Sequence, residues 1–397
     1  MAAESKKRIM GLIGDDAVAW AWRQSNVDVV AAFPITPQTF IVETFDKFVA
    51  NGLVDTEFIT VESEHSAMSA CVGASAAGAR VATATAANGL ALMWEILYIA
   101  ASSRLPIVLN VANRALSSPI NIHCDHSDAM GARDSGFIQI FVQGAQEAYD
   151  TTIMAFKLAE HEDVLLPVMV NLDGFIVSHN LERVELLPDD VVKKFLGVRK
   201  PSFKLDPKNP ITIGPLALTD YYFEFKKQQD DAMKKVPEVY KKVMEEYEAI
   251  SGRRYDIVEK YKTDDADVIM VILGSTAGTG KVVVDHLRKN GEKVGLLRLR
   301  MFRPFPVDII RETLKDAKGV AVFDRAMSFG GAAGPIGMEV RTALYDLEKK
   351  PIITNFIYGL GGRDVPPELI VDGVRRTQKA IEKGKAPALY ETLGVRE

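Results

Sequence analysis

Cysteine is scarce in this sequence, which has only Cys71 and Cys124 among its 397 residues. A conventional iron–sulfur cluster needs four thiolate ligands and a disulfide framework needs several pairs, so this chain can build neither alone. If the protein takes part in redox chemistry, another chain or an organic cofactor must carry the electrons. We expect both cysteines to be packing residues.

A basic excess and a long apolar run are also missing. The 48 Lys and Arg residues are outnumbered by 53 Asp and Glu residues, which argues against a nucleic-acid partner. The most apolar stretch, residues 90–112, is broken by Glu95 and Arg104 and cannot span a membrane. Because no apolar segment of signal-peptide length follows the charged N-terminus, we expect a cytoplasmic protein with no membrane partner.

Short apolar runs alternate with helix-length patterns in the first part of the chain, which is typical of a largely parallel sheet covered by helices. The expected strands are 27–33, 58–61, 81–85, 107–112 and 165–172. The expected helices are 38–49, 63–77, 90–101 and 145–160. Ligands of such sheets gather at the carboxyl ends of the strands, so the strand-to-helix junctions are the places to search.

The pattern changes after residue 186. Four prolines fall within residues 201–215 and mark an extended connector, and residues 220–262 form a charged segment with helical spacing. We interpret this segment as a solvated helix that bridges two domains. Strand patterns resume at 268–273, 294–297, 320–323 and 352–357. The sequence therefore predicts two α/β domains, at residues 1–186 and 265–397, joined by residues 187–264.

Two local motifs resemble known sites but do not fit them. The Gly-rich stretch 274–281 has neither the glycine spacing of a dinucleotide fingerprint nor that of a phosphate-binding loop, so a plain strand–turn–helix is expected, with anion binding at the helix N-terminus as the alternative. His123 and His126 flank Cys124 and Asp125, but no third metal ligand is evident. We predict no metal bound by this chain.

Three junctions of the first domain carry more chemistry. Thr36 follows the first strand between two prolines, Glu64 opens a helix of small residues behind the candidate N-cap Ser63, and Arg114 follows the fourth strand. Each has a purely structural explanation. Together they would place a hydroxyl, an acid and a carboxylate clamp at one edge of a sheet.

Several motifs, spread over nearly the whole chain, resemble one family. They are Ala-Phe-Pro-Ile-Thr-Pro at 32–37, Val-Glu-Ser-Glu-His-Ser-Ala at 61–67, Ala-Asn-Arg-Ala-Leu at 112–116, Asp-His-Ser-Asp at 125–128, Leu-Asp-Gly-Phe-Ile-Val-Ser-His at 172–179, Arg-Pro-Phe-Pro at 303–306 and Gly-Leu-Gly-Gly-Arg-Asp-Val at 359–365. The sequence resembles the α subunit of archaeal-type pyruvate:ferredoxin oxidoreductase, a 2-oxoacid:ferredoxin oxidoreductase. The resemblance implies a thiamine-diphosphate-fold pyrimidine-binding domain followed by a domain similar to the transketolase C-terminal domain.

The resemblance also implies roles for individual residues. Glu64, rather than the nearby Glu62, matches the glutamate that hydrogen-bonds the aminopyrimidine ring of thiamine diphosphate. Thr36 and Arg114 match positions that hold the 2-oxoacid carboxylate. Further cofactor contacts fall on Pro34, Ile35, Asn88 and Gly89, where Asn88-Gly89 replaces the Gln-Gly pair common in pyruvate enzymes.

A missing motif divides the work between subunits. Thiamine enzymes bind the diphosphate and Mg²⁺ through a Gly-Asp-Gly motif, which occurs nowhere in this chain. The resemblance therefore implies a heterotetrameric complex in which a β subunit supplies the diphosphate and Mg²⁺ sites and shares the cofactor. A γ subunit would help to bind coenzyme A, and [4Fe–4S] clusters on the β and δ subunits would pass electrons to ferredoxin.

Pyruvate oxidation to acetyl-CoA and CO₂, a reversible reaction, is the function that the resemblance implies. Three alternatives stay open at the level of sequence. A branched-chain or other 2-oxoacid could be the substrate, since the residues around the substrate tail are not identified. The acyl group could pass to lipoamide instead. The chain could also be a non-catalytic subunit that binds a nucleotide or scaffolds an assembly.

Overall fold

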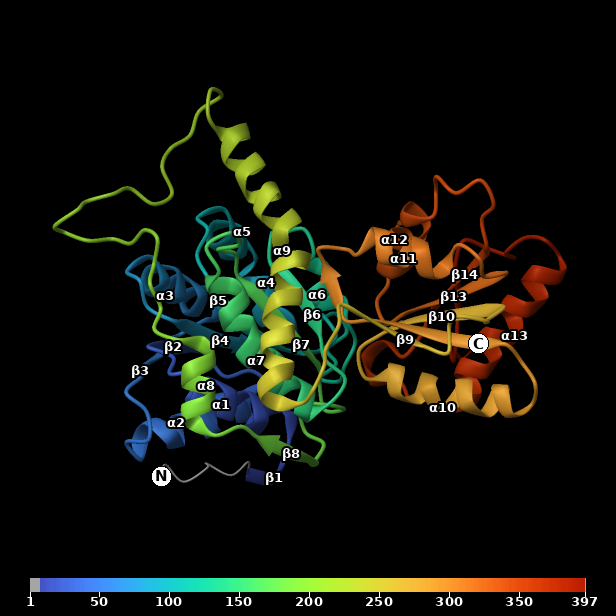
Figure 1. Cartoon of the computed structure of the whole chain (residues 1–397), viewed down its shortest axis with the longest axis horizontal. Helices are drawn as coiled ribbons and strands as arrows, with labels where there is room; N and C mark the ends of the chain where they lie inside the picture. The colour runs from blue at the N-terminus through green and yellow to red at the C-terminus, as the bar shows by residue number, and fades with distance from the viewer. Residues whose placement is uncertain (1–7, 397) are drawn as a thin grey trace.

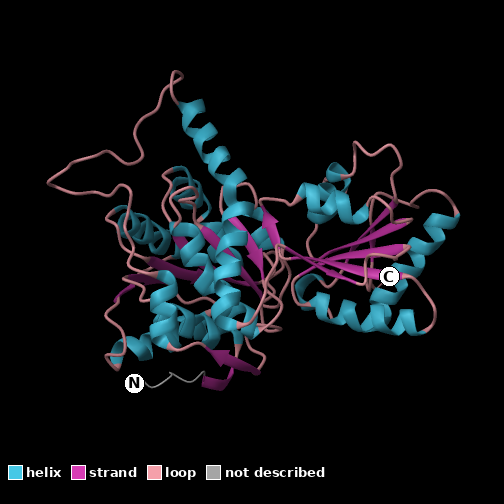
Figure 2. Cartoon of the chain, in the orientation of Figure 1, coloured by secondary structure: helices cyan, strands magenta, loops and turns pink. Residues whose placement is uncertain are grey.

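The expected strands form two separate sheets in a computed structural model, which describes residues 8–396 (Figure 1). A seven-stranded sheet has the order β12-β6-β7-β5-β4-β2-β3, and a six-stranded sheet has the order β15-β14-β13-β10-β11-β9. Helices and sheets alternate in both parts of the molecule (Figure 2). The α/β architecture expected from the sequence is therefore present twice.

The seven-stranded sheet is parallel except at one edge. Its strands are β2 (Val29–Ala32), β3 (Glu57–Thr60), β4 (Val81–Thr85), β5 (Ile107–Asn113), β6 (Ile138–Phe141), β7 (Val168–Asp173) and β12 (Met301–Arg303). The associated helices are α1 (Gly14–Gln24), α2 (Thr39–Ala50), α3 (Glu64–Ala76), α4 (Ala87–Leu92), α5 (Trp94–Ser102), α6 (Ser127–Gly131), α7 (Ala145–Glu160) and α8 (Asp189–Leu196). A separate antiparallel pair joins β1 (Arg8–Leu12) to β8 (Glu182–Leu186).

The smaller sheet is also largely parallel. It contains β9 (Val258–Tyr261), β10 (Val268–Leu273), β11 (Val294–Leu299), β13 (Gly319–Asp324), β14 (Ile352–Ile357) and β15 (Glu391–Thr392). Its helices are α10 (Thr276–Lys289), α11 (Val307–Leu314), α12 (Pro335–Ala343) and α13 (Pro367–Glu382). Strand β9 runs antiparallel to β11, and β12 runs antiparallel to β6. Segment 301–303, which the sequence assigned to the second domain, thus extends the sheet of the first.

Strand β6 was not expected from the sequence. Its short run of four residues is interrupted by Gln139, a polar side chain that usually marks an exposed position. Gln139 is fully buried, and its Nε2 donates to the carbonyl of Ala129 at 2.8 Å. This hydrogen bond satisfies the buried amide nitrogen of Gln139, and no local sequence pattern reveals it.

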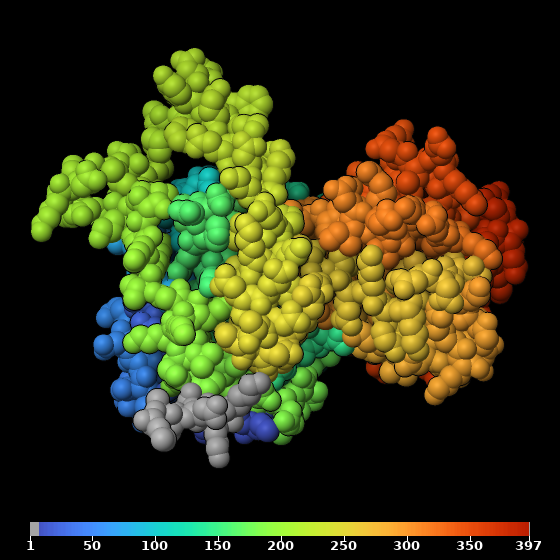
Figure 3. Space-filling view, viewed as in Figure 1, coloured from blue at the N-terminus to red at the C-terminus, as the bar shows by residue number. Residues whose placement is uncertain are grey.

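The segment between the sheets consists of an extended arm and a long helix. Residues 199–221 contain no regular element. Their first part contacts the body, where the backbone N–H of Leu205 donates to the carbonyl of Ala76 at 2.8 Å, and the part after it projects outward before α9 (Tyr222–Ser251) returns along the first domain (Figure 3). The buried positions of α9 form a stripe with helical spacing that packs on α7. They are Ala232, Val236, Val239, Tyr240, Val243, Met244, Tyr247 and Ser251. The interpretation of residues 220–262 as a solvated helix is therefore wrong for the C-terminal half of α9.

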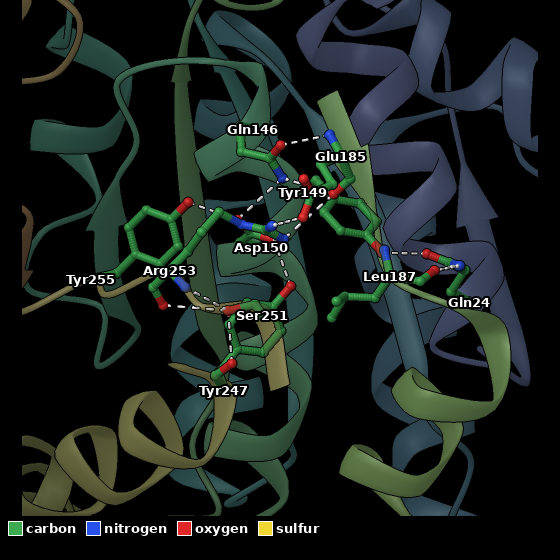
Figure 4. Close-up of polar contacts among 10 residues, drawn as sticks. All are labelled: Gln24, Gln146, Tyr149, Asp150, Glu185, Leu187, Tyr247, Ser251, Arg253 and Tyr255. Atoms are coloured by element: carbon green, nitrogen blue, oxygen red, sulfur yellow. Dashed lines mark hydrogen bonds and ion pairs between the residues drawn. The ribbon is translucent and has the colours of Figure 1, made fainter. Parts of the chain in front are cut away.

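A buried polar cluster fixes the end of α9 to α7 (Figure 4). The carboxylate of Asp150, which is fully buried, accepts hydrogen bonds from the hydroxyls of Tyr247 at 2.5 Å and Tyr255 at 2.6 Å. Arg253 donates to the same carboxylate through Nε at 2.6 Å and through Nη2 at 2.8 Å. One acid thus receives four hydrogen bonds from the helix end and the turn that leads to the second domain.

A second buried acid joins the two sheets. Glu147 of α7 accepts two hydrogen bonds from Arg298 of β11, at 2.9 and 2.8 Å, and one from Nε of Arg300 at 2.5 Å. All three side chains are nearly inaccessible to solvent.

None of the helices described between residues 8 and 396 has the length and apolar character that a membrane-spanning segment needs.

Candidate active site

Glu64 lies at the carboxyl edge of the larger sheet, at the first residue of α3. Ser63 is the N-cap, as the sequence predicts, and its hydroxyl accepts a hydrogen bond from the backbone N–H of Ser66 at 3.2 Å. Glu64 is only 6% exposed, yet its carboxylate has no hydrogen bond to any described residue. By contrast, Glu62 is exposed and accepts a hydrogen bond from the hydroxyl of Ser66 at 3.0 Å.

Gly89 faces this carboxylate from α4. A Cβ added at Gly89 would lie 2.5 Å from Oε1 of Glu64 and 2.5 Å from the hydroxyl of Thr85. The Thr85 hydroxyl is also buried and has no partner among the described residues. Two buried polar groups without partners therefore adjoin a position that only glycine can occupy, which is an arrangement suited to a polar ligand.

Arg114 is brought to Thr36, as expected for two strand-end junctions of one sheet. The guanidinium is 7% exposed; its Nη1 donates to the carbonyl of Thr36 at 3.0 Å and its Nε donates to the carbonyl of Asn121 at 3.1 Å. Its Nη2 has no acceptor within residues 8–396. The side chain of Thr36 is exposed. A carboxylate could therefore bind to Nη2 beside the threonine hydroxyl.

The remaining predicted site residues lie on the same two junctions. Pro34 is exposed and Ile35 is half-buried, and the Ile35 carbonyl accepts from the backbone of Gln38 at 2.9 Å. Asn88 is exposed, and its Oδ1 accepts from the backbone N–H of Ser117 at 3.2 Å. This bond connects α4, which carries Gly89, to the loop that follows Arg114.

Asp128, for which the sequence predicts no separate role, connects these parts. Its buried carboxylate accepts from the backbone N–H groups of Ala87 at 3.0 Å, Arg114 at 2.9 Å and Ala129 at 2.7 Å, and from Nδ2 of Asn113 at 2.9 Å. Burial raises the pKa of Asp128 to about 6, against the opposing effect of these hydrogen bonds. One acid thus fixes the start of α4 and the backbone of Arg114.

The Gly-rich stretch 274–281 forms the strand–turn–helix that the sequence predicts, between β10 and α10. The anion at the N-terminus of this helix comes from the chain itself. The Asp173 carboxylate, at the end of β7, accepts from the backbone N–H of Ser275 at 3.0 Å and from its hydroxyl at 2.5 Å. Gly274 has φ +75, and a Cβ there would lie 2.8 Å from Oδ1 of Asp173.

Two basic side chains, those of His126 and Arg325, also contact the Asp173 carboxylate. His126 Nε2 lies 2.8 Å from its Oδ1, and Arg325 Nη1 donates to its Oδ2 at 3.2 Å. Burial alone would raise the pKa of Asp173, but the charges of His126 and Arg325 and the hydrogen bonds from His126 and Ser275 hold it well below its usual range. The carboxylate is therefore ionised and already satisfied.

Both cysteines are buried, and neither forms a disulfide. Burial raises the pKa of the Cys71 thiol to about 12 and that of Cys124 well above its usual range, so neither is a reactive thiolate. Potential ligand atoms of Cys124, His126 and Asp173 lie within 4.8 Å of one another. A divalent cation among them would face the Arg325 guanidinium, and we assign no metal ion to them.

The structure thus connects all the site residues proposed from the sequence, whose roles remain predictions. Thr36 contacts Arg114, Glu64 adjoins Gly89, and Asn88 and Asp128 link these two pairs. The positions that sequence reasoning missed are Asp128, Asp173 and Asn121. The first two lie in the motifs at 125–128 and 172–179, but only the three-dimensional contacts reveal what they hold.

The chain matches known sequences along most of its length. Residues 21–245 match the family described as "Pyruvate flavodoxin/ferredoxin oxidoreductase, thiamine diP-bdg", and residues 266–370 match "Pyruvate:ferredoxin oxidoreductase core domain II". "Pyruvate synthase subunit PorA" of Thermotoga maritima is 60% identical over 91% of this chain and 92% of that protein. The "Ketoisovalerate oxidoreductase subunit VorA" of Pyrococcus abyssi is 46% identical over 94% of each.

Solved structures show the same fold at lower identity. A 2-oxoglutarate:ferredoxin oxidoreductase from Magnetococcus marinus superposes with a TM-score of 0.72 at 20% identity, over 94% of this chain and 65% of that one. A split-gene transketolase superposes with a TM-score of 0.52 at 13% identity, over 93% of this chain and 99% of that one. The expected α/β fold is confirmed, and a transketolase subunit shares it. On the sequence matches, the chain belongs to the pyruvate flavodoxin/ferredoxin oxidoreductase family.

Proposed function

We propose that this chain is the α subunit of a 2-oxoacid:ferredoxin oxidoreductase that uses thiamine diphosphate to convert pyruvate, coenzyme A and two oxidised ferredoxins to acetyl-CoA, CO₂, two reduced ferredoxins and one proton. The observation that carries the proposal is the buried carboxylate of Glu64, which lacks a partner among the described residues and adjoins the Cα of Gly89. The identity to pyruvate synthase subunits favours pyruvate as the substrate.

The residues present fit the pyrimidine half of thiamine diphosphate. A carboxylate at Glu64 can hold a proton shared with a ring nitrogen, and the hydroxyl of Thr85 offers a second polar contact. The missing Cβ at Gly89 leaves room for a flat ring beside both groups. When bound, thiamine diphosphate supplies the carbon nucleophile and the electron sink for decarboxylation.

Arg114 and Thr36 would bind and orient the substrate. The free Nη2 of Arg114 can donate to the carboxylate of a 2-oxoacid, and the exposed Thr36 hydroxyl can donate beside it. Both lie at the edge of the sheet where Glu64 lies. Such positioning can contribute several kcal/mol by converting a bimolecular encounter into a reaction between fixed groups, with effective molarities of roughly 10⁵–10⁸ M in favourable cases.

The rest of the reaction belongs to partner subunits in this proposal. Because the chain lacks Gly-Asp-Gly and has two buried cysteines, we place the diphosphate, Mg²⁺ and [4Fe–4S] clusters on β and δ subunits. A γ subunit would contribute to coenzyme A binding. The cytoplasmic location expected from the sequence stays a prediction.

A matched pair of variants tests the assignment of Glu64. In the assembled complex, Glu64→Gln should lower kcat by roughly 10²–10⁴-fold because the amide cannot take up a proton. Glu62 is exposed and lies two residues away, so Glu62→Gln should keep a kcat close to that of the unsubstituted enzyme. Steady-state reduction of a low-potential dye measures both. Equal rates for the two variants would exclude Glu64 as the catalytic acid.

Branched-chain 2-oxoacids are the second candidate substrates, because ketoisovalerate oxidoreductase subunits also align over nearly the full chain. A panel of 2-oxoacids assayed for coenzyme A-dependent dye reduction distinguishes the two, and pyruvate should have the highest kcat/KM. Replacing the dye by NAD and lipoamide tests the dehydrogenase alternative. The contact of Asp173 with the Gly274 turn argues against nucleotide binding by a non-catalytic subunit.

A further inference from the structure

The Gly-Leu-Gly-Gly turn of the second domain, residues 359–362, lies against the loop that follows Arg114. Its Gly361 carbonyl accepts from Nδ2 of Asn121 at 2.9 Å, and its Gly361 N–H donates to Oδ2 of Asp125 at 3.1 Å. The next N–H, of Gly362, donates to the carbonyl of Cys124 at 2.6 Å. Three hydrogen bonds therefore hold loop 121–125 to the second domain.

Glycine is required in this turn for two reasons. Gly361 has φ +58 and Gly362 has φ +75, conformations that L side chains rarely adopt. A Cβ at Gly361 would lie 2.4 Å from Nδ2 of Asn121, and one at Gly362 would lie 2.3 Å from Cβ of His123. Any side chain here would push the two loops apart.

Asn121 transmits this contact to the substrate-binding arginine. Its backbone carbonyl accepts from Nε of Arg114 at 3.1 Å, while its side chain bonds to Gly361 and, through Oδ1, to the N–H of His123 at 2.8 Å. Besides Asn121, the guanidinium bonds only to the Thr36 carbonyl within the described residues. The direction of Nη2 therefore depends on where Asn121 is held.

We propose that Asn121 and the Gly361 turn are positioning residues, which orient the Arg114 guanidinium toward the carboxylate of the substrate. The second domain, which contributes no predicted catalytic residue, thereby sets the affinity of the enzyme for its 2-oxoacid. This inference rests on the proposed role of Arg114 in substrate binding.

Two variants in the assembled complex test the proposal. Gly361→Ala pushes Asn121 away, and Asn121→Ala removes its side-chain bonds. Each should raise the KM for pyruvate about tenfold, the effect of losing roughly one charge-assisted hydrogen bond. Because neither residue touches the reacting atoms, kcat should change less than about twofold, and the KM for coenzyme A should stay the same.

Gly384→Ala is the matched control. Gly384 lies in the same domain with φ +69, but nothing lies within 4 Å of an added Cβ. The control thus introduces comparable backbone strain without displacing a neighbour, and its kinetics should equal those of the unsubstituted enzyme. If Gly361→Ala destabilises the fold, its melting temperature relative to that of Gly384→Ala would reveal it. In that case the pyruvate KM of Asn121→Ala, a variant in a surface loop, tests the proposal.

An Arg114→Lys background separates this inference from the function on which it rests. If the turn acts through Arg114, adding Gly361→Ala to Arg114→Lys should raise the KM no further. Fully additive effects, or single variants with the KM of Gly384→Ala, would overturn the positioning role alone. An unchanged pyruvate KM in Arg114→Lys itself would overturn the substrate-binding role of Arg114.

Discussion

At the scale of single residues, the site depends on where side chains are missing as much as on where they are present. Gly89 leaves the space beside Glu64 empty, while Asp128 and Ser63 fix the backbone on either side of that space. Small displacements matter here, since shifting a reacting group by about 1 Å can cost roughly 100-fold in rate.

Gly89→Ala is therefore expected to reduce kcat by roughly 100-fold. The new methyl carbon would lie 2.5 Å from Oε1 of Glu64, so the carboxylate must move. Gly73→Ala in α3 is the control, because its Cβ meets nothing within 4 Å and should stabilise the helix by about 0.5–1 kcal/mol. Dye-reduction rates and melting temperatures of both variants check this, and a fully active Gly89→Ala enzyme would contradict it.

Residues that interact with near neighbours in the sequence are easier to predict than residues whose partners lie far along the chain. Ser63 and Glu64 were identified because a cap and its helix are adjacent in sequence. Asp173 could not be understood that way, since its main partner, Ser275, lies 102 residues along the chain. Asp128 similarly reaches back 41 residues to Ala87.

At the scale of elements, buried acids decide how helices dock. Asp150 on α7 gathers two tyrosine hydroxyls and a guanidinium from the end of α9 and the turn after it. The many charged residues of α9 obscured its apolar stripe in the sequence, so the helix seemed solvated. The spacing of Val236, Val239, Tyr240 and Val243 was the available signal.

Asp150→Asn should lower the free energy of unfolding by about 1.5–3 kcal/mol, because it removes the fully buried charge that pairs with Arg253, which then keeps its ion pair with Glu185 at 2.9 Å. Tyr247→Phe removes one hydrogen bond of the same cluster and should cost about 1–2 kcal/mol. Asp230→Asn, on the exposed face of α9, should have little effect. Urea denaturation measures all three. Equal losses for Asp150→Asn and Asp230→Asn would refute the docking role.

At the scale of the whole molecule, ion pairs join the two domains, and the sequence does not show which residues form them. The pattern of apolar runs predicted two α/β domains, but it could not show that residues 301–303 cross to the first sheet. It also could not show that Glu147 receives Arg298 and Arg300, because these contacts span about 150 residues.

The Glu147 junction gives stability a pH dependence. Burial alone would raise the pKa of Glu147, but the charges of Arg298 and Arg300 outweigh it and lower the pKa from 4.5 to about 2. A group whose pKa is lower in the folded state than in the unfolded state stabilises the fold at every pH above its unfolded-state pKa. For Glu147 this contribution is roughly 3 kcal/mol, and it is lost as the pH falls from 4.5 toward 2.

Glu147→Gln should therefore be markedly less stable than the unsubstituted protein at pH 7, and the difference should shrink between pH 4.5 and pH 3. Thermal unfolding at a series of pH values measures this. Glu162→Gln, at an exposed position, should track the unsubstituted protein throughout. A stability gap for Glu147→Gln that stays constant down to pH 3 would rule out this account.

The carboxylate of Asp173 has one more consequence for the second domain. At the N-terminus of α10 it supplies the negative charge that a helix N-terminus favours, through hydrogen bonds from the backbone N–H and the hydroxyl of Ser275. The carboxylate thus couples the start of α10 to the end of β7, so separating the two sheets would leave both Ser275 donors without this acceptor. A Gly-rich loop that resembles a phosphate site can therefore act as a joint between two domains of one chain.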